Sequence, residues 1–322
     1  MLLISCEHIK QLLSMNEAVR AIEEVFKAQA EGRTNMPPKL YLELPDYSGD
    51  FRAMPAQIEE SVGLKWVSVY PNNPKYDLPT VVATIILCDP RTGCPVAIMD
   101  GTHITNMRTG AAGGVAAKYL ARNDSSIIGM VGAGVQARAQ LMAIIEVLPT
   151  IKEVKVFDRD KLICLNYIEE LGRRFNVNIH LAETIEAATE ADIIVTTTPS
   201  REPIIKKDYI QTGTHINAIG ADGRCKQELE PNLLLSAKIV VDDIEQACHS
   251  GEINIPVSNG TLKRDHIYST LGNIVANFKK GRENDEEITI FDSTGLGIQD
   301  IVCAKIVYEK AKLREIPTFK FF

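Results

Sequence analysis

The stretch VGAGVQARAQL, residues 131–141, decides which fold the chain adopts. An apolar run, SSIIGMV, precedes it and a run with helical spacing follows it, so the glycines lie at a turn between a strand and a helix. Gly132, Gly134 and Ala137 fit the pattern G-x-G-x-x-A. There the first glycine permits a tight turn, the second lets a pyrophosphate approach the backbone, and the small third residue lets the helix pack closely on the strand.

An acidic residue after the next strand separates a dinucleotide site from a plain turn, which the glycines alone would also fit. The run EVKVFD ends at Asp158, about 20 residues beyond the glycines, where a carboxylate can accept hydrogen bonds from ribose hydroxyls. Asp158 also repels a 2′-phosphate, whereas the neighbouring Arg159 partly accommodates one. The stretch therefore predicts a dinucleotide site that takes NAD in preference to NADP.

Strand and helix patterns alternate on the C-terminal side of this turn. After VQARAQLMAIIEVL and EVKVFD come the helical run LICLNYIEELGRRF and the apolar runs ADIIVTTTPS, GTHINAIG, AKIVVDD and ITIFDST. Continuous Ile/Val runs are typical of strands that are covered on both faces, and alternation with helices is how parallel strands are connected. We expect an α/β domain with a parallel sheet.

The first part of the chain has a different pattern. Residues 15–33 carry apolar side chains at helical spacing. KLYLELP, FRAMPAQI, VGLKWVSVYP and LPTVVATIILCDPRTGCPVAIMD have strand patterns, and DPRTG marks a hairpin turn. We expect a mostly antiparallel sheet with one helix here. The final run GIQDIVCAKIVYEKAKL predicts an amphipathic helix that packs on this first part.

Composition limits the class of protein. With 322 residues, 45% hydrophobic and 24% charged, the chain is typical of a soluble two-domain protein. Its net charge of -7 gives no basic surface for nucleic acid. The seven cysteines are scattered without metal-ligand spacing, which indicates a reducing compartment and no metal site. No run reaches the ~18 apolar residues that span a bilayer, so we expect a cytoplasmic protein without membrane or nucleic-acid partners.

Four cations are candidates for binding an anionic substrate. Lys65 interrupts the apolar strand GLKWV, a pattern that fits either a solvated lysine or a partly buried one with a lowered pKa. Lys39 and Arg52 lie in neighbouring strands and also fit ordinary surface positions. Arg108 precedes a helix rich in small residues, which lets a ligand approach closely, so it is a candidate to bind a phosphate or carboxylate.

Polar residues also follow two strands of the predicted parallel sheet. Asp222 comes after the run INAIG, and Asp292 and Ser293 end the run ITIFDS. The carboxyl ends of parallel strands are where open α/β sheets bind ligands. The six histidines show no metal-ligand pattern and stay unassigned.

Taken together, the motifs resemble those of the ornithine cyclodeaminase/mu-crystallin family, most closely its archaeal-type alanine dehydrogenases. The resemblance covers nearly the whole chain and is carried by MPPKLYLE, RAMPA, GLKWV, LPTV, MDGTHITNMRTGAAGGVAAKYLA, GAGVQA, TTTPS, GTHINAIGADGRCKQEL, VVDDIEQA and EEITIFDSTGLGIQD. It implies a Rossmann NAD-binding domain over residues 116–302. It also implies an α+β domain for substrate binding and dimerisation, made of residues 1–115 and 303–322, so we expect a homodimer.

The resemblance also implies roles for individual residues. The family's catalytic lysine falls on Lys65, its acid beside the substrate amine on Asp222, and its carboxylate-binding arginine on Arg108. Substrate-binding residues are expected at Lys39, Arg52, Lys65 and Arg108. Cofactor-binding residues are expected at Thr80, Arg108, Gly132, Gly134, Val135, Gln136, Asp158, Arg159, Lys226 and Ser293.

One position departs from the cyclodeaminases. Where they place a Glu that holds the distal ammonium of ornithine, this chain has Arg52, which would repel that ammonium. The resemblance then implies reversible, NAD-dependent oxidative deamination of a small L-amino acid, with L-alanine favoured and pyruvate and ammonia as products. Lys65 or Asp222 would move the protons. The alternatives are reduction of the cyclic imine Δ1-pyrroline-2-carboxylate, ornithine cyclodeamination, and non-enzymatic binding of a dinucleotide and a small ligand.

Overall fold

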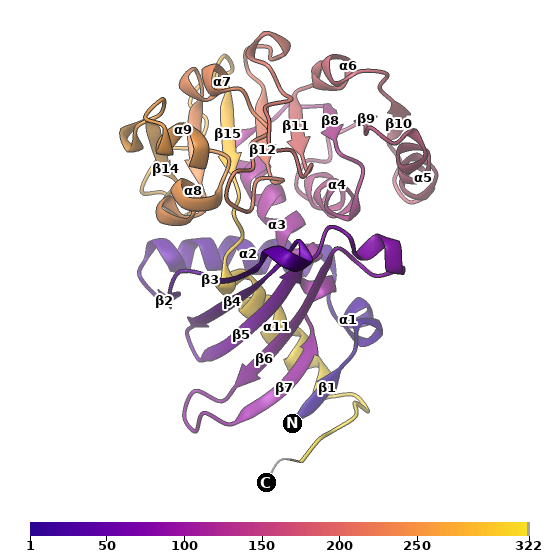
Figure 1. Cartoon of the computed structure of the whole chain (residues 1–322), viewed down its shortest axis with the longest axis vertical. Coiled ribbons are helices and arrows are strands. Elements are labelled where there is room, and N and C mark those ends of the chain that lie inside the picture. The colour runs from indigo at the N-terminus through magenta and orange to yellow at the C-terminus, as the bar shows by residue number, and fades with distance from the viewer. Residues whose placement is uncertain (321–322) are drawn as a thin grey trace. The chain divides into compact units, whose positions relative to one another are not determined.

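The computed structural model describes residues 1–320 and divides into two compact units (Figure 1). The N-terminal unit comprises residues 1–108 and the chain from Leu296 onward, and the C-terminal unit comprises Thr109–Gly295. These divisions precede the positions expected from the sequence, 115/116 and 302/303. Helix α3 (Thr102–Leu120) runs through the first division, and helix α11 (Gly297–Ala311) lies wholly in the N-terminal unit.

A mixed sheet forms the N-terminal unit. Its strands follow the order β1-β7-β6-β5-β4-β2, and β3 also pairs with β4. All neighbours are antiparallel except β1 and β7, which confirms the expected antiparallel pattern. The three-residue β1 was not predicted, because so short a run shows no alternation. The strands are β1 (Leu2–Ile4), β2 (Thr34–Asn35), β3 (Leu40–Leu44), β4 (Gly49–Ile58), β5 (Ser61–Val69), β6 (Val81–Cys88) and β7 (Pro95–Asp100).

Helices cover one face of this sheet. Helix α11 contacts β4, β5, β6 and helix α2 (Met15–Ala30), as its amphipathic pattern predicted (Figure 1). Ser14 and Glu17 begin α2 with a capping box, and its apolar face is buried. The expectation of a single helix before the strands was wrong: α1 (Cys6–Leu12) precedes α2, and its seven residues are too few to show a clear period.

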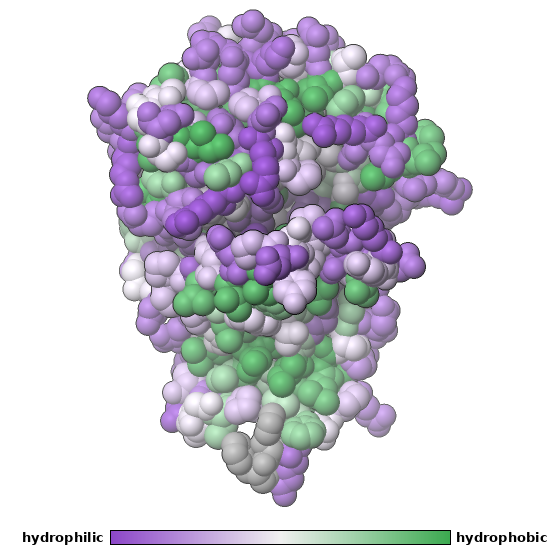
Figure 2. Space-filling view, viewed as in Figure 1, coloured by the Kyte–Doolittle hydropathy of each residue, from purple (hydrophilic) through white to green (hydrophobic). Residues whose placement is uncertain are grey.

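The two faces of the N-terminal sheet differ because side chains alternate along each strand. Met54 and Lys65 are paired across β4 and β5 on the face that α11 covers. Leu42, Trp66 and Val82 lie on the opposite face, where they are exposed. Figure 2 shows apolar residues gathered over this sheet.

The C-terminal unit contains an eight-stranded sheet in the order β10-β9-β8-β11-β12-β15-β13-β14, with every pair parallel. The sequence predicted six of these strands; the exceptions, β10 and β14, are the edge strands, which lack a continuous buried run. The bounds are β8 (Ile127–Val131), β9 (Glu153–Phe157), β10 (Asn178–Leu181), β11 (Ile193–Thr196), β12 (His215–Ala218), β13 (Lys238–Val241), β14 (Ile267–Thr270) and β15 (Thr289–Asp292).

Helices cover both faces of this sheet. Ile193 and Val195 pack in a core with α3, α4 and α5, whereas Ile194 packs in a second core with α6, α7 and α8. No helix within residues 1–320 combines the length and apolar character that crossing a bilayer requires. The remaining helices are α4 (Val135–Val147), α5 (Lys161–Gly172), α6 (Ile185–Thr189), α7 (Pro231–Leu235), α8 (Ile244–Ser250), α9 (Asn254–Ser258) and α10 (Leu271–Val275), with 3₁₀ turns at Pro45–Tyr47, Asn73–Tyr76, Lys207–Tyr209 and Arg264–His266.

The strand order fixes where a ligand is expected. The chain leaves β8 for β9 and β10 on one side and returns to β11 on the other side of β8. This is the Rossmann order, and its reversal places a crevice at the carboxyl ends of β8 and β11. The glycine stretch begins directly after β8 at that edge.

Candidate active site

The N-terminal unit buries a cluster of charged side chains carried by β5, α3 and α11. Lys65 Nζ lies 2.7 Å from Asp300 Oδ2, and Arg108 Nε donates to Asp300 Oδ1 at 2.9 Å. The Lys65 side chain is 1% exposed and that of Asp300 is 0% exposed. One carboxylate therefore holds two cations side by side, away from bulk water.

Two uncharged side chains complete the cluster. Lys65 Nζ donates to Thr105 Oγ1 at 3.3 Å, and this hydroxyl in turn donates to the carbonyl of Gly101, directly before α3. Arg108 Nη1 donates to Gln299 Oε1 at 3.2 Å. The positions of both cations are thus set by residues of α3 and α11, which are regular helices packed in the fold.

The surroundings of Lys65 change its acidity. Burial and the Arg108 guanidinium lower the pKa of Lys65 to about 7, against the opposing effect of Asp300. Lys39 lowers it further. Of the two orientations that the sequence left open, the structure therefore has the buried one. A lysine that titrates near neutrality can take up and release a proton at physiological pH.

Arg52 lies on the same face of the sheet as Lys65, on β4. It is buried, its Nε donates to Asp50 Oδ1 at 2.7 Å, and its guanidinium lies 5.4 Å from the ring centroid of Tyr41. The sequence argument against ornithine counted the positive charge of Arg52 and did not foresee its partner Asp50. Asp50 offsets much of the charge, because the two side chains form a close ion pair.

In the C-terminal unit the glycine stretch forms the expected turn. Gly132 has a φ of 94°, and a Cβ there would lie 2.8 Å from Thr197 Oγ1, so only glycine fits. Gly134 caps the start of α4, and a Cβ at this position would meet nothing within 4 Å. The space beside the Gly134 Cα is therefore open, and Val135 and Gln136 lie next to it in the first turn of the helix.

Asp158 lies beside this turn, as predicted. Its Oδ2 accepts a hydrogen bond from Ala133 N at 2.8 Å, and its Oδ1 accepts one from Asp160 N at 3.1 Å. A carboxylate has further acceptor capacity beyond these two bonds, so ribose hydroxyls can still donate to it. The adjacent Arg159 is exposed.

The other expected residues fall at three places. Asp222 Oδ1 and Lys226 Nζ form an ion pair of 2.5 Å in the loop after β12. Ser293, directly after β15, is buried, and its Oγ has no hydrogen-bond partner within residues 1–320. Buried hydroxyls are normally hydrogen-bonded, so this one fits a ligand contact. Thr80 belongs to the N-terminal unit, where its carbonyl accepts Tyr70 N at 2.8 Å.

Buried carboxylates that the sequence did not single out hold the loops at the carboxyl edge of the sheet. Glu228 accepts hydrogen bonds from Thr196 Oγ1 at 2.7 Å, from Thr198 N at 2.7 Å and from Gly220 N at 2.9 Å. Glu252 accepts one from the Glu228 backbone N at 2.9 Å. The loops after β11 and β12, the second of which carries Asp222, are thereby joined to each other.

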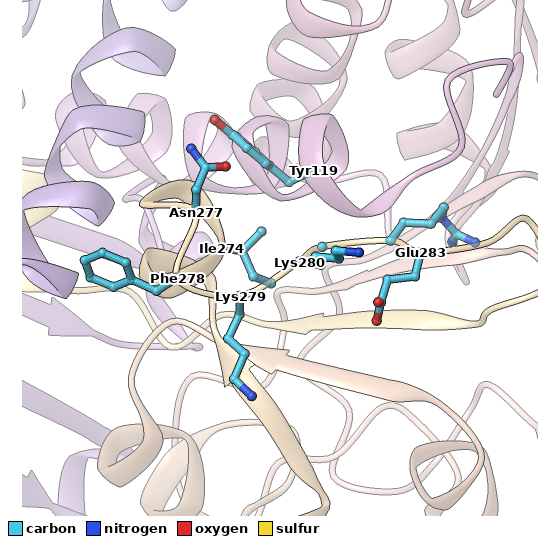
Figure 3. A pocket seen from close by; sticks show the side chains of 9 residues that line it. Tyr119, Ile274, Asn277, Phe278, Lys279, Lys280 and Glu283 are labelled. Atoms are coloured by element: carbon cyan, nitrogen blue, oxygen red, sulfur yellow. The ribbon is translucent and has the colours of Figure 1, made fainter.

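A cavity of about 530 Å³ lies elsewhere in the C-terminal unit (Figure 3). Tyr119, Ile274, Phe278 and the loop 279–283 line it, and none of these was a predicted site residue. Its Arg282 has a structural role, because its guanidinium donates to the carbonyls of Leu120 and Glu287 at 2.7 Å. We assign no function to this cavity.

Comparison with known proteins gives the family. The model of the ornithine cyclodeaminase/mu-crystallin family matches residues 1–315. The chain belongs to this family. Alanine dehydrogenase of Archaeoglobus fulgidus is 50% identical over an alignment of 325 positions, which covers 100% of this chain and 98% of that protein.

Two solved structures of this family closely resemble the chain. One is an archaeal alanine dehydrogenase dimer with bound NAD, at a TM-score of 0.96 and 49% identity, which covers 100% of this chain and 99% of that one. The other is Δ(1)-pyrroline-2-carboxylate reductase of Thermococcus litoralis in complex with NADH and L-proline. It has a TM-score of 0.97 and 42% identity and covers 99% of this chain and 100% of that one.

The structure of this family member brings some expected residues together. Lys65 meets Arg108 through Asp300, Asp222 pairs with Lys226, and Asp158 contacts the glycine turn. Lys65 and Arg108 belong to the N-terminal unit, and the glycine turn and Asp222 belong to the C-terminal unit.

Sequence reasoning missed Asp300, Thr105 and Gln299 in the charged cluster. One signal was available for Asp300: it is an acid in a predicted helix where Ile298, Ile301 and Val302 are apolar. A buried acid usually has a cationic partner. The sequence does not say which cation this is.

Proposed function

We propose that this member of the ornithine cyclodeaminase/mu-crystallin family is an NAD-dependent dehydrogenase that interconverts L-alanine with pyruvate and ammonia. The observation that carries the proposal is the buried group of Lys65, Asp300 and Arg108. It offers a cation for a carboxylate next to an amine that titrates near neutrality. Half of the chain's residues are identical to those of an alanine dehydrogenase of the same length, which supports this substrate.

The residues of the C-terminal unit fit NAD. The backbone at Gly134 is open to a pyrophosphate, Asp158 has acceptors for ribose hydroxyls, and the buried Ser293 hydroxyl lacks a partner within the described chain. In our proposal the glycine turn, Val135 and Gln136 hold the phosphates, while Asp158 holds the adenosine ribose. When bound, NAD accepts the hydride of the amino acid or returns it to the imino acid.

The N-terminal unit would bind the substrate and move protons. Asp300 and Gln299 use only part of the donors of Arg108, which leaves other N–H groups for a substrate carboxylate. Deamination needs a group that takes a proton from the substrate ammonium and from the water that attacks the imino acid. With a pKa of about 7, Lys65 can take these protons at neutral pH. Asp222 remains the alternative proton carrier.

We also propose that the protein is a homodimer formed through the open face of the N-terminal sheet. Leu40 and Trp66 on this face are 63% and 38% exposed, and Leu42 and Val82 are exposed beside them. A contiguous apolar face of this kind is typical of an interaction surface. Light scattering of the purified protein should give the mass of two chains, and a monomer at micromolar concentration would contradict this assignment.

A substrate comparison tests the proposed activity. We expect NADH formation with L-alanine and NADH consumption with pyruvate plus ammonia, each with a higher kcat/KM than with other pairs. The comparison pairs are L-proline with Δ1-pyrroline-2-carboxylate, which the likeness to the Thermococcus reductase makes the second candidate, and L-ornithine. If the enzyme instead prefers Δ1-pyrroline-2-carboxylate, the proposed activity is wrong and the protein is a reductase that forms L-proline.

A further inference from the structure

We propose that Asp300 is a positioning residue for this reaction: its carboxylate holds the Lys65 amine and the Arg108 guanidinium in fixed places and offsets one of their two charges. The role of Asp300 in catalysis rests on the proposed function. Its contacts do not depend on that function: the carboxylate lies 2.7 Å from Lys65 Nζ and 2.9 Å from Arg108 Nε.

The two oxygens of the Asp300 carboxylate contact different cations. Oδ2 faces Lys65 and Oδ1 faces Arg108, so the two cations do not compete for one oxygen. All three side chains are buried, and a buried charge that loses its partner is strongly destabilising. Asp300 also lies in the first turn of α11, a helix packed on β4, β5 and β6. The carboxylate is therefore positioned by the core of the unit and not by a mobile loop.

The charge balance suits a substrate with one carboxylate. When Lys65 is protonated, the three groups carry one net positive charge, which a single carboxylate neutralises. Without Asp300 the Lys65 and Arg108 side chains would carry two positive charges in surroundings of low polarity. Asp300 therefore leaves this three-residue cluster with a charge that suits one substrate carboxylate.

The charged groups around Lys65 predict how Asp300 acts on its acidity. Arg108 and Lys39 favour the neutral amine, as burial does, and Asp300 favours the ammonium. Cys303, one turn further along α11, does not titrate in this range, because burial and the charge of Asp300 raise the pKa of its thiol to about 12. Removal of the Asp300 charge should therefore lower the pKa of Lys65.

The substitution Asp300→Asn tests this, because it keeps the shape of the side chain and removes the charge. The pKa of Lys65 is measured from the ¹³Cε chemical shift of lysine-labelled protein, with the signal assigned by its loss in Lys65→Met. We expect the midpoint to fall by about one pH unit or more relative to the wild type. An unchanged midpoint in folded Asp300→Asn protein would overturn the proposal.

A control separates positioning from general destabilisation. Asp242 is equally buried but lies in the C-terminal unit, where it accepts hydrogen bonds from the backbone of Thr294 and Gly295 at 2.7 Å. Asp242→Asn should lower the stability and leave the Lys65 midpoint in place. A midpoint that moves equally in both variants would mean that the shift follows from loosened packing, and Asp300 would lose its assigned role.

Two further measurements keep the outcomes distinct. If Asp300→Asn does not fold, Arg108→Gln should instead raise the Lys65 midpoint, because it removes the positive charge that repels the Lys65 ammonium and leaves Asp300 as its charged neighbour. No upward shift would mean that the three groups do not act on one another, which contradicts the proposal. Where alanine is turned over, kcat/KM of Asp300→Asn should fall about 10²-fold at its optimum, since misplaced groups lose near-attack geometry. Absence of alanine turnover by the wild type refutes the proposed function but leaves the titration as a test of Asp300.

Discussion

The carboxylate of Asp158 accepts a hydrogen bond from the backbone N–H of Ala133 at 2.8 Å, which joins the end of β9 to the turn after β8. Ala133 lies between the two glycines of that turn. The acid is therefore beside the backbone that would hold a pyrophosphate, at the edge where the strand order reverses. This contact is consistent with the predicted preference for NAD over NADP.

Asp158→Ser should weaken the binding of NAD much more than the binding of NADP. The change deletes an acceptor for the ribose hydroxyls and also removes the charge that repels a 2′-phosphate. Charged hydrogen bonds contribute roughly 1.5–3 kcal/mol, so the ratio of the two dissociation constants should move by about tenfold or more. The measurement is fluorescence titration with NADH and NADPH.

Asp160→Ser is the matched control for this substitution. Asp160 is an exposed acid two positions along the chain, and its side chain caps α5 by accepting Leu162 N at 2.9 Å. The control removes the same charge nearby and should leave the ratio unchanged. An unaltered ratio in Asp158→Ser as well would mean that Asp158 does not face the ribose.

Lys65→Ala should abolish most of the catalysis while NADH binding persists. Lys65 belongs to the N-terminal unit, and the residues proposed to hold the phosphates belong to the C-terminal unit. Loss of a general acid/base costs about 10² or more in turnover. Steady-state kcat and NADH titration on the same preparation check both parts. If Lys65→Ala keeps a near wild-type rate, Lys39 becomes the next candidate for the proton carrier.

Several parts of this fold were predictable because burial leaves a pattern in the sequence. The central strands β8 and β11 are covered on both faces and appear as nearly continuous apolar runs, whereas β12 and β15 are equally buried but alternate apolar with polar residues. The glycine turn was predictable because Gly132 has a backbone conformation that other residues rarely adopt. The edge strands β10 and β14 are only partly buried and therefore lack this signal.

The charged cluster was only partly predictable, for a different physical reason. Lys65 interrupts an apolar strand, so the neighbouring sequence alone marks it as an unusual position. Its partner Asp300 lies in a helix near the other end of the chain, and its contact with Arg108 spans 192 residues. No periodicity links such positions. Only the folded chain shows that the acid offsets the cations, and likewise that Asp50 offsets Arg52.

Acid should destabilise the protein partly through His215. This residue is buried, with Nδ1 at 3.0 Å from Thr289 Oγ1 and Nε2 at 3.0 Å from Asn217 Oδ1. Burial and the charge of Arg282 lower the pKa of His215 to about 3. The unfolded chain therefore binds a proton near the ordinary pKa, whereas the folded chain does not. The free energy of unfolding should fall as the pH drops from about 6.5 towards 3.

His215→Gln isolates this contribution. Glutamine does not titrate, so between pH 6.5 and 5 the wild type should lose about 2 kcal/mol more unfolding free energy than the variant does. Urea denaturation of both proteins at the two pH values gives the difference. Other titrating groups are common to both proteins and cancel. Equal losses in the two proteins would show that His215 stays uncharged in both states or charges in both.

Arg52→Glu tests the class of substrate. Arg52 is buried on the face that also carries Lys65, so a ligand bound beside Lys65 on this face would meet its charge or that of its partner Asp50. The reversal replaces an ion pair by two acids. A substrate carboxylate should then bind more weakly, and the distal ammonium of ornithine should gain a partner.

The expected size of this change follows from the strength of charged contacts. At roughly 1.5–3 kcal/mol each, the combined preference should move by at least about tenfold towards ornithine. kcat/KM for pyruvate reduction and competition by ornithine measure the two sides. Asp50→Asn is the control, because it removes the negative charge paired with Arg52 and should move the preference in the opposite direction. If neither variant changes either quantity, this ion pair does not border the substrate, and ornithine returns as a candidate.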